Sequence, residues 1–224
     1  MANEENKAFL RRVPMFAGLA DSQLDTLASA SLRRSFPRNR TIVAEGEPSQ
    51  SLYLLLSGRA KVQRSDAEGK EVILAIIGSG EFFGEMSLID DAPRSASVIT
   101  IEPCDFIAIQ KDSFKATLAQ SPDMAMQIMR GLVKRLREAD KKIETLALLD
   151  VYGRVARVLL DFSETIDGER VVKGKLPRQE IAKMIGASRE MVSRVMKGLE
   201  SDGFISTQPE GRLVLREKIS TYLN

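Results

Sequence analysis

Seven apolar residues recur along the middle of this 224-residue chain at alternating intervals of four and three. They are Ala125, Met129, Leu132, Leu136, Ala139, Ile143 and Leu146. Three heptads of this pattern are typical of a two-stranded coiled coil. A helix packed on its own domain also needs an apolar stripe, but the strict period and the flanking charges favour a partner helix. The sequence therefore predicts a long helix over residues 123–149 and a two-fold homodimer formed through residues 125–146.

The residues before this helix predict helices followed by a β domain. Residues 6–32 have helical spacing of apolar residues, and Asp21 is the expected N-cap of a helix. From Thr41 onward, short apolar runs alternate with turns that contain glycine. The clearest runs are 52–56, 72–74 and 106–109, and the turns contain Gly46, Gly58, Gly69 and Gly80. Short strands with regular turn signals indicate a small sandwich or barrel-like domain, which we assign to residues 1–122.

Residues 150–224 predict a compact C-terminal unit of helices and a hairpin. The expected helix, turn, two short helices and hairpin cover residues 152–163, 167–168, 177–185, 189–201 and 204–215. Gly186-Ala187 forms the turn between the short helices, and Ser188 is the expected N-cap of the second one. Two short helices joined by such a turn and followed by a hairpin indicate a winged helix-turn-helix. The predicted fold class is α+β.

The composition excludes much enzyme chemistry. Histidine is absent, and Cys104 is the single cysteine. A Ser-His-Asp triad, a His-ligated zinc or haem, and a cluster held by several thiolates cannot be built from these residues. We expect a protein that is not an enzyme and that holds no metal and no other cofactor.

The lack of targeting signals predicts a cytoplasmic protein, and the charge distribution predicts a basic C-terminal third. No apolar stretch approaches the roughly 20 residues that span a bilayer, and the N-terminus lacks a secretory pattern. We therefore expect no membrane partner. Residues 1–150 carry 20 Lys and Arg against 21 Asp and Glu, whereas residues 151–224 carry 13 against 10. This excess places a candidate nucleic-acid-binding surface in the second range.

Four polar residues of the second short helix share one face. At 3.6 residues per turn they lie within about 140° of one another: Arg189, Glu190, Ser193 and Arg194. Arginine can donate two hydrogen bonds to guanine, and glutamate can accept one from cytosine. The face could instead be solvated, with local salt bridges. The preceding helix, the tight turn and the hairpin favour reading of a DNA major groove.

Two motifs resemble a known family. They are Gln179-Glu180-Ile181 followed by Gly186-Ala187-Ser188-Arg189-Glu190-Met191-Val192-Ser193-Arg194, and Leu146-Ala147-Leu148-Leu149-Asp150-Val151-Tyr152-Gly153-Arg154. Both are similar to segments of the Crp/Fnr family of bacterial transcription regulators. The resemblance covers nearly the whole chain. It implies an N-terminal β-roll that binds cyclic nucleotides, a dimerisation helix and a C-terminal winged helix-turn-helix.

The resemblance also implies roles for individual residues. Arg189, Glu190 and Arg194 would read bases, with Ser193 on the same face. Phosphate contacts would come from Arg178, Gln179 and Ser188. The implied target is double-stranded DNA with TGTGA-like half-sites, repeated as a palindrome about 34 Å apart. RNA polymerase is the implied protein partner.

A second segment has the groups to bind a cyclic nucleotide. Its candidate ligand residues are Gly84, Glu85, Met86, Ser87, Arg94 and Ser95. Gly84 permits close backbone approach, Glu85 can accept from a ribose hydroxyl, and Arg94 offers a planar fork for a phosphate. Glu85 and Arg94 could also simply pair across a loop. Together the residues resemble the phosphate-binding cassette of cyclic-nucleotide-binding domains.

The long helix bears on which nucleotide binds. In cyclic-AMP-binding members of the family, a Thr-Ser pair on this helix reaches the adenine, and that pair aligns with Ala139 and Asp140 here. A carboxylate suits the donors of guanine better. Arg137 and Asp140 also resemble an Arg-x-x-Asp motif of some cyclic di-GMP receptors, although an i,i+3 salt bridge is the simpler reading. We expect cyclic AMP as the regulatory ligand, with cyclic di-GMP as the alternative.

Two other classes of protein use similar parts. A cyclic-nucleotide sensor that acts through protein contacts would share the β-roll but would not need residues 176–215. A redox or gas sensor of the same family would need a cysteine cluster or a haem ligand. The sequence therefore favours a ligand-controlled DNA-binding regulator.

Overall fold

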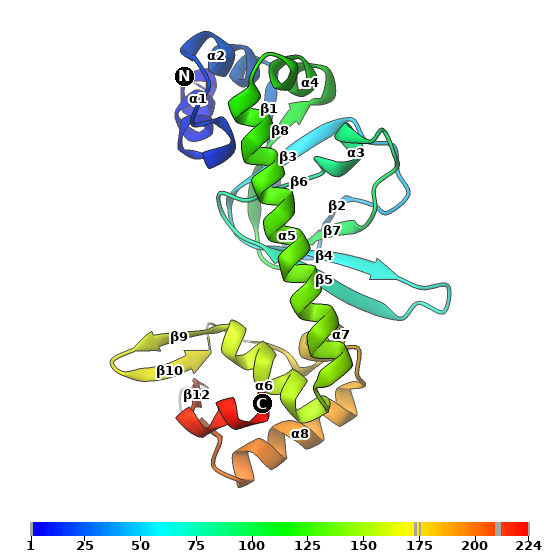
Figure 1. Ribbon diagram of the computed structural model, residues 1–224, viewed down its shortest axis with the longest axis vertical. Coiled ribbons are helices and arrows are strands. Elements are labelled where there is room, and N and C mark those ends of the chain that lie inside the picture. Colours follow the sequence, from blue (N-terminus) through cyan, green and yellow to red (C-terminus); the bar gives the residue numbers. More distant parts are fainter. Residues whose placement is uncertain (1, 173, 175, 209–211, 224) are drawn as a thin grey trace. The chain divides into compact units, whose positions relative to one another are not determined.

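The computed structural model describes residues 2–172, 174, 176–208 and 212–223. The chain divides into two compact units, Met1–Arg135 and Leu136–Asn224. Helices and antiparallel strands occur in both units (Figure 1). The α+β fold class is confirmed.

The N-terminal unit begins with helices, continues as strands and ends on a long helix. Its elements are α1 (Ala2–Arg12), η1 (Pro14–Phe16), α2 (Asp21–Ser29), β1 (Ser31–Phe36), β2 (Thr41–Val43), β3 (Ser51–Ser57), β4 (Ala60–Ser65), β5 (Glu71–Ile77), β6 (Phe82–Phe83), α3 (Met86–Ile89), β7 (Ser97–Thr100), β8 (Cys104–Gln110), α4 (Lys111–Ala119) and α5 (Pro122–Leu148). The helix expected to be capped by Asp21 begins at that residue instead. Ala20 is the N-cap, and its backbone N–H donates to the Gln23 side chain.

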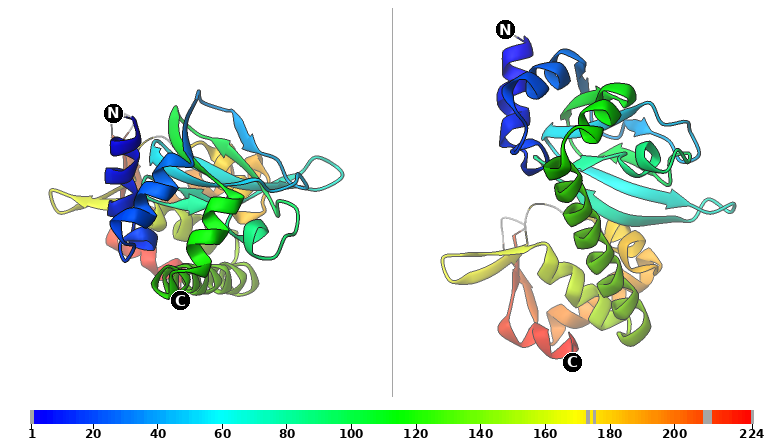
Figure 2. Two further views of the ribbon diagram at one scale, coloured as in Figure 1. Left: turned by 90° about the horizontal axis from the view of Figure 1, so that it is seen from above. Right: turned by 45° about the horizontal axis from the view of Figure 1, so that its top comes forward.

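Two four-stranded antiparallel sheets form the β-roll. Their strand orders are β1-β8-β3-β6 and β2-β7-β4-β5. The β4–β5 hairpin projects from the roll in every view (Figures 1 and 2). Gly58 joins β3 to β4 with φ at +87°, and a Cβ there would lie 2.3 Å from the carbonyl oxygen of Pro103. This turn therefore requires glycine.

Two apolar clusters hold the N-terminal unit together. One joins the helices α1, α2 and α4 and the start of α5 to β3 and β8, and it contains Phe16, Leu54, Ile107 and Phe114. The other contains Leu55, Ala60, Val98 and Phe106 and joins strands of the two sheets. Cys104 is buried in this second cluster, and burial raises the pKa of its thiol.

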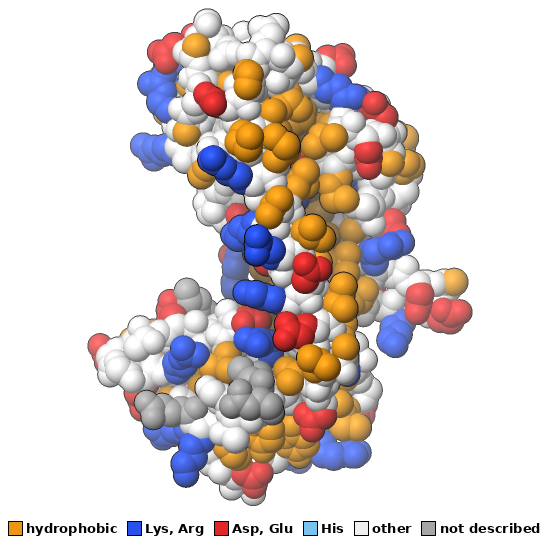
Figure 3. Space-filling view, viewed as in Figure 1, with side chains coloured by type: hydrophobic (Ala, Val, Ile, Leu, Met, Phe, Trp, Pro, Cys, Tyr) orange, Lys and Arg blue, Asp and Glu red, His pale blue; other side chains and the backbone are white. Residues whose placement is uncertain are grey.

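The exposed apolar stripe of α5 differs from the predicted seam. Leu132 packs partly buried against the core of the N-terminal unit, which covers part of this seam position. The large apolar side chains of α5 up to Leu146 that are 46–65% exposed are Met126, Met129, Val133, Leu136, Ile143 and Leu146. Figure 3 shows hydrophobic side chains following this helix. The stripe available to a partner therefore includes Met126 and Val133 in place of Ala125 and Leu132.

The C-terminal unit contains the expected helix-turn-helix and one hairpin that the sequence reading missed. Its elements are α6 (Val151–Asp161), β9 (Ser163–Ile166), β10 (Glu169–Val172), α7 (Arg178–Ile185), α8 (Arg189–Ser201), β11 (Ile205–Thr207), β12 (Leu213–Leu215) and η2 (Glu217–Leu223). The strands form one sheet in the order β11-β12-β10-β9. Residues 209–211, in the middle of the expected 204–215 hairpin, lie outside the described residues.

Ser188 caps α8 as expected. Its side chain accepts a hydrogen bond from the backbone N–H of Met191 at 3.1 Å. Ser188→Ala is expected to lower the free energy of unfolding by about 1 kcal/mol, because one amide at the start of the helix loses its partner. Urea unfolding measures this change. Ser201→Ala, at the exposed end of the same helix, is the matched control, and equal losses in both variants would contradict the capping role.

Candidate functional site

The turn between α7 and α8 fixes how the second helix is presented. Gly186 ends α7 in the left-handed conformation, with φ at +66°, which glycine adopts without strain. The buried face of α8 packs into the core of the C-terminal unit through Val192, Val195, Met196 and Leu199. This packing leaves the opposite face of α8 open to solvent.

The open face carries the four predicted reading residues. A groove of about 470 Å³ is lined by Arg189, Glu190, Ser193, Arg194 and Lys197. Among the described residues, Arg189, Glu190 and Arg194 make no ion pair, so the local salt bridges of the simpler reading are not formed. Lys197 was not predicted from the sequence. It follows Ser193 by four residues, and this helical spacing could have placed it on the same face.

The N-terminal end of α7 presents the predicted phosphate contacts. Arg178 and Gln179 are the first two residues of α7, and both side chains are exposed. Ser188 is also exposed, although its hydroxyl already caps α8. Helix N-termini and such side chains suit phosphate groups.

Gly84 and Arg94 lie against each other in the predicted ligand cassette. Gly84 has φ at +89°, and a Cβ there would lie 2.1 Å from Nη1 of Arg94. Arg94 is 6% exposed and donates to the carbonyl oxygens of Gly84 at 3.0 Å and Ser51 at 2.6 Å. Its guanidinium also lies 5.9 Å from the centre of the Tyr53 ring. The two backbone carbonyls therefore fix the orientation of the arginine.

Burial shapes the electrostatics of Arg94. It lowers the pKa of the guanidinium, whereas nearby Tyr53 and Glu85 raise it. Arginine remains charged in proteins. Arg94 therefore brings a positive charge into a site with little solvent, where it can bind an anion more strongly than at the surface.

Glu85 is fully buried and has one free oxygen. Its Oε1 pairs with Arg135 of α5, which also donates to the carbonyl of Phe82 and lies over that ring at 4.9 Å. Its Oε2 is buried without a hydrogen-bond partner among the described residues. Glu85 thus pairs with Arg135 and not with Arg94, the partner that the simpler reading suggested. Arg135 was not among the predicted ligand residues.

The remaining cassette residues differ in how available they are. Ser87 is buried, and its hydroxyl donates to the carbonyl of Pro93 at 3.3 Å, inside the cassette itself. Ser95 is exposed, and the side chain of Met86 is 48% exposed. Ser95 is therefore the cassette hydroxyl open to a ligand.

The candidate base-contacting residues lie on α5. Arg137, Ala139 and Asp140 are all exposed. In the described part of the chain, neither the Arg137 nor the Asp140 side chain makes a hydrogen bond or an ion pair, so their i,i+3 salt bridge is not formed. Both side chains are available to a ligand or a partner helix.

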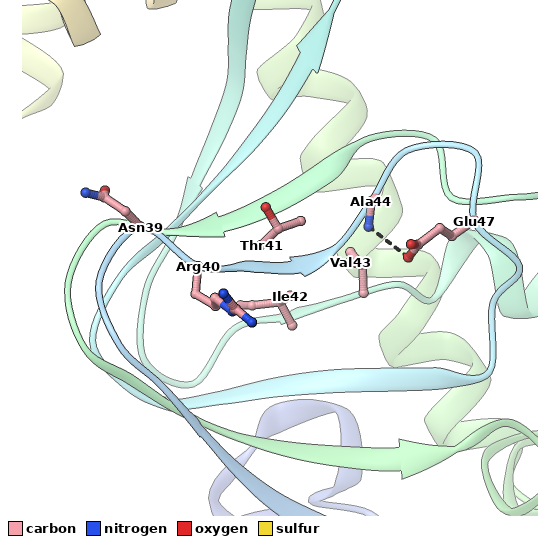
Figure 4. A pocket seen from close by; sticks show the side chains of 7 residues that line it. All are labelled: Asn39, Arg40, Thr41, Ile42, Val43, Ala44 and Glu47. Atoms are coloured by element: carbon pink, nitrogen blue, oxygen red, sulfur yellow. Dashed lines mark hydrogen bonds between the residues drawn. The ribbon is translucent and has the colours of Figure 1, made fainter.

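Other surfaces show less of a site. A groove of about 370 Å³ follows β2 and is lined by Asn39, Arg40, Thr41, Ile42, Val43, Ala44 and Glu47 (Figure 4). It contains none of the predicted ligand residues, and its Glu47 carboxylate accepts from the amide of Ala44. The described residues hold no cluster of three His, Cys, Asp or Glu side chains placed for a metal ion. Within the same residues, every helix is too short or too polar to cross a membrane.

Two family models match this chain. Residues 33–121 match the cyclic nucleotide-binding domain, and residues 153–218 match the Crp-like helix-turn-helix domain. The chain belongs to the Crp/Fnr family of transcriptional regulators. The family resemblance drawn from the sequence is confirmed.

Individual relatives agree with this assignment. The chain is 34% identical over 210 residues to the CRP-like cAMP-activated global transcriptional regulator of Mycobacterium tuberculosis, which covers 92% of this chain and 93% of the relative. It is 35% identical over 204 residues to the cyclic AMP receptor protein of Thermus thermophilus, covering 91% and 93%. A solved structure of the c-di-GMP responsive global regulator CLP of Xanthomonas campestris has a TM-score of 0.73 and 30% identity, covering 88% of this chain and 99% of that chain. The protein is a CRP-like regulator with a cyclic nucleotide-binding domain and a Crp-like helix-turn-helix.

Proposed function

We propose that this regulator binds DNA under the control of cyclic AMP held by the cassette of its N-terminal unit. The main observation behind this proposal is that Glu85 is fully buried and that one of its carboxylate oxygens has no hydrogen-bond partner among the described residues. A buried acceptor without a donor is costly. A ribose 2′-hydroxyl is a donor of the right kind, and a bound nucleotide would remove that cost.

Arg94 supports the same ligand from the other end of the cassette. Its buried guanidinium is held by the carbonyls of Gly84 and Ser51, and a planar fork of this kind suits a phosphate. The exposed hydroxyl of Ser95 is a neutral donor beside it. A cyclic mononucleotide offers a phosphate to Arg94 and a ribose hydroxyl to Glu85. The relatives from Mycobacterium tuberculosis and Thermus thermophilus are named for cyclic AMP.

The DNA-reading part of the proposal rests on α8. Arg189, Glu190 and Arg194 extend from an open face without internal ion pairs in the described structure. We infer that they read bases in the major groove, with Arg178, Gln179 and Ser188 on phosphates. The expected target is a palindrome of TGTGA-like half-sites, which matches the two-fold axis of a dimer.

The dimer is proposed through the exposed stripe of α5. Six large apolar side chains lie on this helix with 46–65% of their surface exposed, and burial against a second copy would remove that surface from water. Soluble proteins rarely leave such a continuous stripe uncovered. RNA polymerase is the protein partner that we infer from the family.

Cyclic di-GMP is the second candidate ligand, and a different observation favours it. The Arg137 and Asp140 side chains are exposed and unpaired among the described residues. A carboxylate can accept from the N1–H and N2–H of guanine, and arginine can donate to its O6 and N7. The structurally similar regulator CLP is described as c-di-GMP responsive.

Isothermal titration of the purified protein separates the two ligands. We expect cyclic AMP to bind with a micromolar Kd and cyclic di-GMP to bind at least tenfold more weakly, because Glu85 and Arg94 fit a single ribose and phosphate. If cyclic di-GMP bound tightly and cyclic AMP bound only with a millimolar Kd, cyclic di-GMP would be the regulatory ligand. DNA-binding assays with a TGTGA palindrome and a scrambled duplex, each with and without nucleotide, test the regulation.

A further inference from the structure

Residues 90–93 form the loop of the cassette that links α3 to Arg94, and among the described residues one side chain of this loop makes polar contacts with another segment. The amide of Asp90 donates to Met86, the amide of Ala92 donates to the Asp90 side chain, and the carbonyl of Pro93 accepts from Ser87. All three bonds stay inside the cassette. Among the described residues, the polar contacts from this loop to another segment are those of Asp91.

Asp91 is held by two lysines of α4. Lys111 Nζ lies 2.7 Å from Oδ1, and Lys115 Nζ lies 2.8 Å from Oδ1 and 3.0 Å from Oδ2. Lys111 and Lys115 are four residues apart and therefore lie on the same side of the helix. Both hydrogen bonds lower the pKa of Asp91 to about 2, so the carboxylate is charged at every pH at which the protein would be studied.

The helix that carries the lysines is firmly placed. Phe114 of α4 is fully buried in the core of the N-terminal unit, and Thr117 is also buried. Asp91 itself is in the left-handed conformation, with φ at 57°, which non-glycine residues adopt at some cost. The ion pairs thus connect a loop in an unfavourable backbone conformation to a fixed helix.

We propose that Asp91 is a positioning residue for the nucleotide, which acts by fastening the cassette loop to Lys111 and Lys115. Asp91 lies six residues after Glu85 and three before Arg94, so its attachment limits how far the loop between these two ligand groups can move. A loop that is ordered before the ligand arrives does not have to be ordered by it, and this increases affinity. The inference rests on the proposed function, since it concerns the same cassette.

Asp91→Asn tests the charge without disturbing the backbone, because asparagine tolerates the left-handed conformation well. The pairs are solvent-accessible, with the Asp91 side chain 59% exposed, so the expected change is moderate. We expect the Kd for cyclic AMP to rise about fivefold. The Lys111→Gln/Lys115→Gln double variant should give the same rise. Asp112→Asn, an exposed carboxylate between the two lysines, should leave the Kd unchanged.

Combining the changes distinguishes positioning from separate local effects. The triple variant combines Asp91→Asn, Lys111→Gln and Lys115→Gln. If Asp91 acts through the lysines, this variant should bind cyclic AMP no more weakly than Asp91→Asn alone. The proposal would be overturned if the rise in Kd of the triple variant were the product of the two separate rises, or if Asp91→Asn bound cyclic AMP with wild-type affinity. The thermal midpoint of each variant shows whether the fold is retained.

Amide hydrogen exchange on the ligand-free protein tests the attachment without relying on the ligand. The amides of Ala92 and Arg94 should exchange faster in Asp91→Asn than in the wild type, and Asp112→Asn should leave them unchanged. Unchanged exchange in Asp91→Asn would refute the attachment. A wild-type protein that binds no cyclic AMP but shows this faster exchange on substitution would refute the proposed ligand alone.

Discussion

Replacing Arg94 with glutamine is expected to weaken cyclic AMP binding by about 100-fold, equivalent to about 2.7 kcal/mol. Arg94 is 6% exposed, and its guanidinium is held by the carbonyls of Gly84 and Ser51, so its position is fixed before a phosphate binds. Charge-assisted hydrogen bonds to a phosphate are each worth about 1.5–3 kcal/mol. Isothermal titration measures the change in Kd.

The control for this prediction is Arg64→Gln. Arg64 lies on β4 and pairs with Glu45 at the surface, so the same chemical change there should leave the Kd for cyclic AMP unchanged. Thermal unfolding of both variants shows whether each retains the fold. Wild-type cyclic AMP binding by folded Arg94→Gln would exclude the cassette as the phosphate site.

Local patterns in the sequence predicted much of the fold correctly. Ser188 was expected to cap α8, and its hydroxyl does accept from Met191. Both this cap and the helix-ending Gly186 depend on a few neighbouring residues, so a short stretch of sequence contains the information. The hairpin β9–β10 was missed because its strands are short and rich in polar residues. The Asp167-Gly168 turn was predicted, and its φ values of 50° and 82° agree with a tight hairpin turn, but the flanking strands were not assigned to it.

The interactions that the sequence did not predict join distant segments. Glu85 and Arg135 are 50 residues apart, and no periodicity connects a cassette loop to a long helix. The exposed stripe of α5 differs from the predicted seam for a related reason. A heptad count cannot tell which apolar residues pack on the helix's own unit, and Leu132 does so while Val133 is exposed. Tertiary packing decides between two stripes that the sequence allows equally.

Arg189→Ala is expected to remove about 1–3 kcal/mol of discrimination at one base pair of each half-site. Arg189 is the first residue of α8 and lines its open groove without an ion pair among the described residues. Its guanidinium is free to donate to the O6 and N7 of guanine. The measurement is a competition assay with duplexes that carry each of the four bases at every half-site position.

Lys197→Ala measures the contribution of a phosphate contact, which does not depend on the base sequence. Lys197 lines the same groove two turns further along α8, where we expect it to meet a phosphate. Its loss should weaken binding to all duplexes alike and reduce the slope of log Kd against log salt by about one. Arg12→Ala, an exposed arginine on α1, should change neither property. Arg189→Ala could instead lower the affinity for all duplexes equally, as Lys197→Ala is expected to do. That result would make Arg189 a phosphate contact and would leave Glu190 and Arg194 as the base-reading residues of α8.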